Sequence, residues 1–149
     1  MRCLLDTHIV ILAMVGSEKL SSRVRDILES PDNLLYVSPV SVWEVVIKDA
    51  LRPTDMPVTA AQMIRFCHES GIVELPVGFR HSLRVATLPL LHNDPSDRML
   101  VAQALEDGRR TEPSFARQEP AAIWRCCDSC LTDGIFHSLP LAHGRRNMV

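Results

Sequence analysis

The sequence has little of what membrane proteins and many nucleic-acid-binding proteins depend on. Aromatic residues make up 5% of the 149 residues, which argues against a surface on which successive bases stack. No apolar run approaches the ~20 residues that a membrane-spanning helix needs. A glycine-rich loop of the kind that cradles phosphates is also missing. With 46% hydrophobic residues, the chain is expected to build one core and one domain.

A basic surplus is missing as well. Residues 1–108 hold 10 lysines and arginines against 14 acidic residues, whereas residues 109–149 hold six arginines and four acidic residues. Affinity for nucleic acid comes mainly from neutralising phosphates, so a protein of this composition is a poor general nucleic-acid binder. If the protein handles nucleic acid, it needs local arginines, a metal ion or a partner.

A secretory leader is not expected either. Met1 and Arg2 run directly into an apolar stretch, which leaves no room for a signal peptide and favours a cytoplasmic protein. Cys3 and Cys67 lie in apolar contexts, where a reduced cysteine behaves as a small hydrophobic residue.

Strands and helices are predicted to alternate along the first 108 residues. A buried strand at residues 3–5 is followed at once by a helix. Further helices are predicted at residues 21–30, 39–50, 59–70, 81–88 and 94–108, and further strands at 34–38 and 72–76. Because helices separate the strands and no hairpin signal occurs, the connections should be crossovers in a parallel sheet.

Three carboxylates occupy positions where such sheets bind ligands, just beyond the carboxyl ends of the strands. Asp6 ends the first strand, Glu44 lies in the first turns of the third helix, and Asp97 lies in the first turn of the last one. Each also has a structural explanation. Asp6 could cap its helix, Glu44 could form a capping box with Ser41 or pair with Lys48, and Asp97 could respond to the helix dipole.

Together, the three acids point to a bound cation. Two carboxylates ~4 Å apart repel each other by roughly 4 kcal/mol at an effective dielectric constant near 20. A cluster of three therefore requires a proton or a cation, and oxygen ligands suit Mg²⁺ or Mn²⁺. Such an ion can activate water against a phosphodiester.

Three stretches carry a resemblance to a known family. Residues 3–8, 37–45 and 92–104 resemble the motifs of PIN-domain proteins, most closely the VapC-type toxins of type II toxin–antitoxin systems. The likeness covers residues 1–108 and leaves 109–149 as an atypical tail. It implies a three-layer α/β/α sandwich with a central parallel sheet, and a Mg²⁺-dependent endoribonuclease that hydrolyses RNA.

The resemblance also implies roles for individual residues. Asp6, Glu44 and Asp97 match three of the four metal-site acids of the family, and Thr7 and Arg98 match neighbours that contact the substrate or the metal ligands. Asp94 is close by in the sequence, but we interpret it as the N-cap of the helix that continues with Pro95. Mg²⁺ is the implied cofactor, with Mn²⁺ as the alternative. The implied partners are RNA, a cognate antitoxin that covers the acidic groove, and a second copy bound through residues 22–29 and 41–49.

The end of the sequence departs from the family. The fourth acid would fall at Phe115, and neither the acid nor its strand is recognisable there. We hypothesise that the reading frame changes near Gly108. Translating the gene in the neighbouring frame should then restore a Thr-x-Asp strand, and its absence there would refute the hypothesis.

The missing acid leaves a second interpretation open, namely a catalytically impaired PIN fold that binds antitoxin or RNA without cleaving. Phosphatases of the haloacid dehalogenase type also begin with a strand that ends in Asp, but they need a second Asp where this chain has His8.

Trp43, beside Glu44, is expected to pack between helices.

The tail contains a spacing that a zinc site could use, with two cysteines and two histidines in the order C-x2-C-x6-H-x5-H: Cys127, Cys130, His137 and His143. The gap between the second cysteine and the first histidine is shorter than in zinc fingers. The spacing therefore favours incidental cysteines over a structural zinc site.

Overall fold

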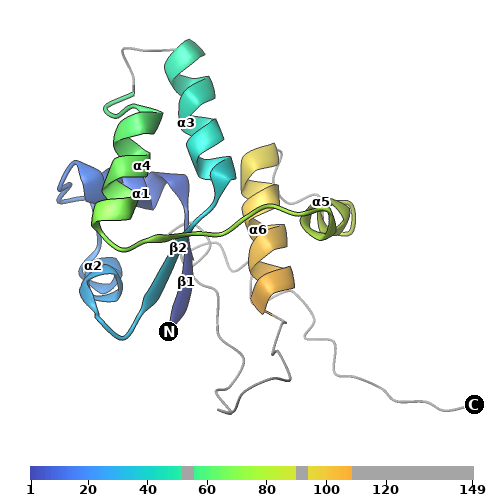
Figure 1. The fold of residues 1–149 in the computed structure, drawn as a ribbon, viewed down its shortest axis with the longest axis horizontal. Helices are drawn as coiled ribbons and strands as arrows, with labels where there is room; N and C mark the ends of the chain where they lie inside the picture. Colours follow the sequence, from blue (N-terminus) through green and yellow to red (C-terminus); the bar gives the residue numbers. More distant parts are fainter. Residues whose placement is uncertain (52–55, 90–93, 109–149) are drawn as a thin grey trace, which may run out of the picture.

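The computed structural model describes residues 1–51, 56–89 and 94–108. Two helices follow each strand in these ranges, so helices separate the strands as the sequence pattern predicts (Figure 1). The elements in chain order are β1 (Arg2–Leu5), α1 (Thr7–Met14), α2 (Ser22–Glu29), β2 (Leu34–Val37), α3 (Pro39–Leu51), α4 (Ala60–Glu69), β3 (Val73–Glu74), α5 (Phe79–Val85) and α6 (Pro95–Gly108).

The three strands form one parallel sheet with β2 in the centre. Leu5 of β1 lies opposite Val37, and Val37 lies opposite Glu74 of β3. This register aligns the carboxyl ends of the three strands at one edge of the sheet. The predicted parallel sheet is confirmed, and its edge is the place where the acidic side chains were expected to gather.

Alternating side chains of β1 supply both layers of the core, because successive residues of a strand point to opposite faces. Cys3 and Leu5 join the larger core, to which α1, α2, α3 and α4 contribute. Leu4 and Tyr36 join a second cluster with Leu100 of α6. In Figure 1, α1, α2 and α4 lie on one side of β1 and β2, and α5 and α6 lie on the other. The expected α/β/α sandwich is therefore the observed architecture.

Local signals locate most of the helix ends. Ser21 accepts a hydrogen bond from the backbone N–H of Val24 at the start of α2, and Thr59 forms a capping box with Gln62 at the start of α4. Pro39 is the first residue of α3, where its missing N–H has no cost. Gly71, with φ of +69°, ends the turn after α4 in a conformation that other residues adopt only with strain.

Two predicted boundaries need correction. The helix expected at residues 81–88 is α5, which begins at Phe79 and ends at Val85, because Gly78 already provides its N-terminal cap position. The strand expected at residues 72–76 is shorter, since β3 covers Val73 and Glu74, and the N–H of Leu75 adds one more hydrogen bond to the carbonyl of Val37 in β2.

A buried glutamine holds α6 against the sheet. The Ser38 hydroxyl donates to Oε1 of Gln103 at 2.6 Å, and Nε2 of Gln103 donates to the Leu75 carbonyl at 3.0 Å. Gln103 is fully buried, so these contacts have no competition from water. They connect α6 to the residue before α3 and to the residue after β3, and so they fix α6 beside the carboxyl edge.

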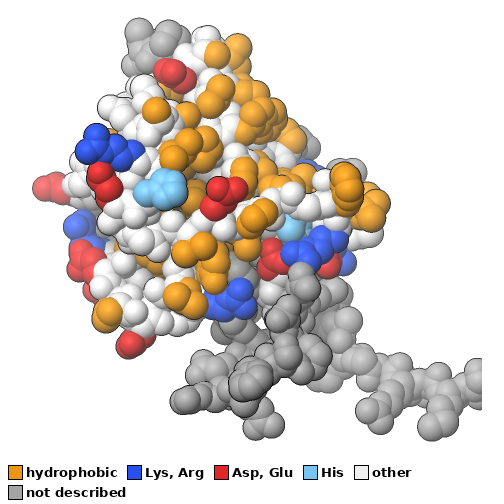
Figure 2. All heavy atoms as spheres, viewed as in Figure 1, with side chains coloured by type: hydrophobic (Ala, Val, Ile, Leu, Met, Phe, Trp, Pro, Cys, Tyr) orange, Lys and Arg blue, Asp and Glu red, His pale blue; other side chains and the backbone are white. Residues whose placement is uncertain are grey.

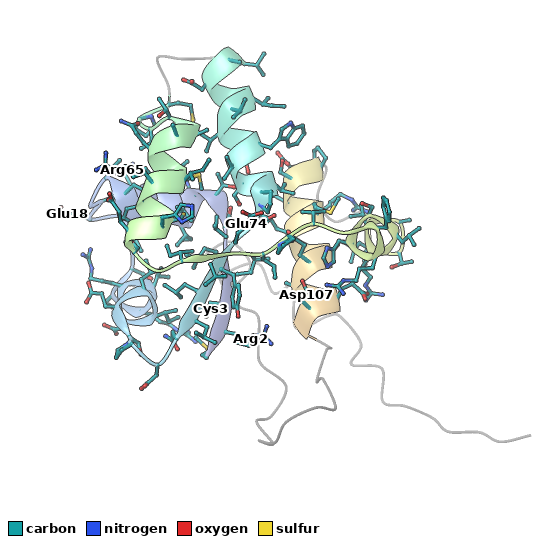
Figure 3. All side chains as sticks on the ribbon, viewed as in Figure 1. Arg2, Cys3, Glu18, Arg65, Glu74 and Asp107 are labelled. Carbon is teal, nitrogen blue, oxygen red and sulfur yellow. The ribbon has the colours of Figure 1, made fainter. Side chains whose placement is uncertain are left out.

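A second polar cluster fastens α5 to the other end of α6. Arg80 donates to Oδ1 of Asp107 at 2.6 Å, and Nε2 of the fully buried His81 lies 3.3 Å from Oδ2 of Asp107. Figure 3 shows Asp107 near the C-terminal end of α6, beside α5.

Within the described ranges, no helix has the length and apolar character needed to cross a membrane.

Burial raises the pKa of the Cys3 and Cys67 thiols above the usual value. Both thiols therefore stay protonated at neutral pH and pack as small apolar groups, as the sequence context suggested.

Candidate functional site

The turn from β1 into α1 presents Asp6 at the carboxyl edge of the sheet. Asp6 is the N-cap of α1, and its Oδ1 accepts the backbone N–H of His8 at 3.3 Å. The capping role considered for this residue is therefore real. Thr7, the next residue, is buried as the first residue of α1.

Glu44 receives contacts from two different helices. Its Oε2 accepts the Thr7 hydroxyl at 2.6 Å, and its Oε1 accepts the ammonium of Lys48, one turn further along α3. The carboxylate is 13% exposed. A capping box with Ser41 is wrong for this residue, because Ser41 lies inside α3 and both Glu44 oxygens are directed to Thr7 and Lys48. The Thr7 contact brings Asp6, its neighbour in sequence, to the same edge as Glu44.

The start of α6 brings two more carboxylates to this place. Oδ1 of Asp94 accepts the backbone N–H groups of Ser96 at 2.8 Å and of Asp97 at 3.4 Å, which confirms Asp94 as the cap of α6. Asp97 lies in the first turn. Figure 1 shows the N-terminal end of α6 beside the N-terminal half of α3, and the two helices are in contact.

The electrostatics of Lys48 show that the acids of α3 and α6 act on one point. The hydrogen bond to Glu44 is the largest cause that raises the pKa of the Lys48 ammonium, and partial burial opposes it. The charges of Glu44, Asp94 and Asp97 raise this pKa further. Glu44 is therefore in contact with this cation, and Asp94 and Asp97 attract it through their charges.

Arg98 is directed toward the end of α5. Its guanidinium donates to three backbone carbonyls, those of Val85 at 3.0 Å, Leu88 at 3.3 Å and Pro89 at 2.8 Å. These contacts hold the segment after α5 against α6. A contact between Arg98 and the substrate stays a prediction.

The donor chemistry of the edge fits a hard divalent ion. Asp6, Glu44, Asp94 and Asp97 offer only oxygen, as Mg²⁺ and Mn²⁺ prefer, and Lys48 shows that a cation is attracted there. Across residues 1–51, 56–89 and 94–108, no three Asp, Glu, His or Cys side chains are gathered tightly enough to hold a metal. A shared ion therefore requires these side chains to turn toward one another.

Sequence reasoning underrated two residues. Lys48 was considered only as a helix-surface partner of Glu44, and Asp94 only as a cap. The four-residue spacing of Glu44 and Lys48 was visible in the sequence. The approach of Asp94 to Lys48 depends on the packing of α6 against α3. The predictions on the tail, including Phe115 as the place of the fourth acid, the zinc spacing and the change of frame, lie outside the described residues.

The Thr7–Glu44 hydrogen bond leads to a prediction for stability. Replacing Thr7 with valine keeps the volume and removes the hydroxyl that Glu44 accepts, so we expect the free energy of unfolding to fall by about 1–2 kcal/mol. Thr7→Ser keeps the hydroxyl and should lose less. Urea denaturation of both variants measures the difference, and a valine variant as stable as the wild type would contradict this role.

The comparison with protein families agrees with this arrangement. A family model described as PIN domain matches residues 3–110. No curated protein and no solved structure matches the chain significantly. The matched residues include the strand end at Asp6, the helix that carries Glu44 and the first turn of α6. Since the match covers well over half of the sequence, the chain belongs to the PIN-domain family.

Proposed function

We propose that this protein is a Mg²⁺-dependent endoribonuclease that acts as the toxin of a type II toxin–antitoxin pair. The observation that carries the proposal is the Glu44 carboxylate at the carboxyl edge of the sheet, which accepts hydrogen bonds from Thr7 of α1 and from the cation of Lys48. Glu44 contacts Lys48 directly, and Asp94 and Asp97 act on the same ammonium. Thr7 ties the strand end that carries Asp6 to this group.

PIN domains are generally metal-dependent nucleases. In this chain, Asp6, Glu44 and Asp97 would hold the ion, which we take to be Mg²⁺ with Mn²⁺ as a substitute. When bound, the ion supplies an activated water and stabilises the charge that develops on the phosphodiester. Thr7 fixes the orientation of the Glu44 carboxylate, as hydrogen-bond donors next to metal ligands commonly do.

The charge balance limits how RNA can bind. Residues 1–108 carry more acidic than basic residues, so contacts to phosphates across a broad surface would be weak. Recognition of RNA then depends on the acidic edge with its cation, and cutting is expected to need a specific RNA shape rather than any single strand.

The exposed side of α3 supports the proposed homodimer. Trp43 does not pack between helices as predicted, since 52% of its surface is exposed. Val46, Ile47 and Leu51 are exposed on the same helix. Figure 2 shows hydrophobic side chains gathered along the α3 side of the molecule. This apolar surface suits a second copy that buries it.

An antitoxin completes the proposal. A nuclease that cuts cellular RNA is harmful unless it is restrained, and an antitoxin segment with a basic side chain could neutralise the acidic edge. Such a pair acts in the cytoplasm, where the RNA is.

The alternative function is an impaired PIN fold that binds antitoxin or RNA without cleaving. The observation that favours it is the Lys48 contact, which already occupies one oxygen of Glu44. The RNA cleavage assay described next distinguishes the two functions.

Cleavage of structured RNA tests the proposed activity. Asp6→Asn should lower the cleavage rate by about 100-fold or more, because loss of a metal ligand is expected to cost at least as much as loss of the groups that support ligands. The matched control is Asp32→Asn, which makes the same change at an exposed position between α2 and β2 and should cut at the wild-type rate.

The rates are measured on gels with Mg²⁺ and with excess EDTA. EDTA should abolish cutting by the wild type. Cutting that persists in EDTA or in Asp6→Asn would place the chemistry elsewhere, and a wild type that binds RNA without cutting would favour the impaired fold.

The homodimer has its own test. Val46→Glu places a charge within the exposed apolar surface of α3, and we expect it to shift the protein from dimer to monomer in light scattering coupled to size-exclusion chromatography. Leu83→Glu, an equivalent change at an exposed position of α5, should leave the dimer intact. A wild type that is monomeric at high concentration would refute the dimer.

A further inference from the structure

The cation that the structure places on the acidic edge belongs to the protein itself. The Lys48 ammonium contacts Oε1 of Glu44 and lies in the field of Asp94 and Asp97. Its side chain is 54% exposed, whereas that of Glu44 is 13% exposed. Lys48 therefore approaches a largely buried carboxylate from the solvent side.

A second ion pair shows what an ordinary helix-surface contact looks like in this chain. Arg65 contacts Glu69 at 2.7 Å with the same four-residue spacing, and both side chains are mostly exposed. Figure 3 shows Arg65 on the outer side of α4, away from α6. Lys48 differs because its partner Glu44 is mostly buried and is also held by another helix through Thr7.

We propose that Lys48 is a tethered counter-ion, meaning a side-chain cation that occupies Glu44 and that a divalent ion must displace in order to bind. This inference rests on the proposed function, because it assumes that Glu44 is a metal ligand. The inference goes beyond the proposed function because it assigns to Lys48 the control of metal affinity.

The two contacts of Glu44 respond differently to an arriving ion. The Thr7 hydroxyl is neutral, and a carboxylate that accepts such a hydrogen bond can still bind a metal through its remaining lone pairs. An ammonium and a divalent ion repel each other at the same carboxylate. Lys48 is the group that leaves, since its flexible four-carbon stem can turn into solvent while Thr7 is buried in α1.

Displacement of Lys48 has a cost that weakens metal binding. The ion must break the contact of Lys48 with Glu44 and overcome the attraction of Lys48 to Asp94 and Asp97. In the absence of a divalent ion, the same contacts reduce the repulsion among these carboxylates and so stabilise the fold.

Titration of the full-length protein with Mn²⁺, followed by electron paramagnetic resonance of the free ion, tests the proposal. Lys48→Met removes the charge and keeps the length of the side chain. We expect it to bind Mn²⁺ roughly 3- to 10-fold more tightly than the wild type, the range expected if one partly exposed ion pair and its repulsion of the metal are lost. Without a divalent ion, its melting temperature should be lower than that of the wild type, and Mn²⁺ should raise it by more.

Two controls separate this effect from a general loss of charge. Lys48→Arg keeps a cation at the position and should bind Mn²⁺ with nearly the wild-type affinity. Arg65→Met breaks the surface pair on α4 and should leave the affinity unchanged. If Lys48→Met does not fold, Lys48→Gln makes the same comparison with a polar side chain.

The outcomes distinguish this proposal from the proposed function. If the wild type binds Mn²⁺ and the uncharged variant binds it equally or more weakly, Lys48 is not a competitor, and the metal-dependent nuclease still stands. If neither protein binds Mn²⁺, both proposals are overturned. The tethered counter-ion is supported if Lys48→Met binds Mn²⁺ more tightly than the wild type while Lys48→Arg and Arg65→Met do not.

Discussion

A largely buried carboxylate is compatible with a stable fold only when hydrogen bonds or a cation compensate its charge. This constraint organises the structure around Glu44. Thr7 donates to one oxygen of Glu44, and Lys48 contacts the other. Asp94 and Asp97 then act on the same ammonium from α6. The acidic edge is therefore compatible with a stable fold because the protein supplies its own positive charge.

Buried polar contacts position the helix that brings the last two acids. Gln103 connects α6 to Ser38 and Leu75, and Arg98 connects it to the carbonyls after α5. Hydrogen bonds shielded from water are directional, so they set the position of a helix more narrowly than apolar packing does. The residues that hold α6 in place are thus as important to the edge as the acids themselves.

The surface divides into regions of different chemistry. Glu44 and Lys48 lie on α3, and exposed apolar side chains of the same helix gather on the face shown in Figure 2. A charged edge suits a metal ion and a phosphodiester, while exposed apolar side chains suit another protein.

Much of this fold could be predicted from local sequence. The apolar run that ends at Asp6, the cap at Ser21 and the proline that opens α3 each depend on near neighbours in the chain, and each prediction agrees with the structure. The boundaries of α5 were less certain because Gly78 offers no side-chain cap, so the sequence pattern carried a weak signal there.

The sequence by itself determined which residues form strands and helices and which acids stand at their ends, because periodicity and capping act over a few residues. Only the tertiary structure decided that Thr7 contacts Glu44, that Arg98 faces backbone carbonyls and that Trp43 is exposed. It also decided that Asp94 and Asp97 act on Lys48. These relations join residues that are far apart in the chain, and they depend on how α3 and α6 pack across the sheet.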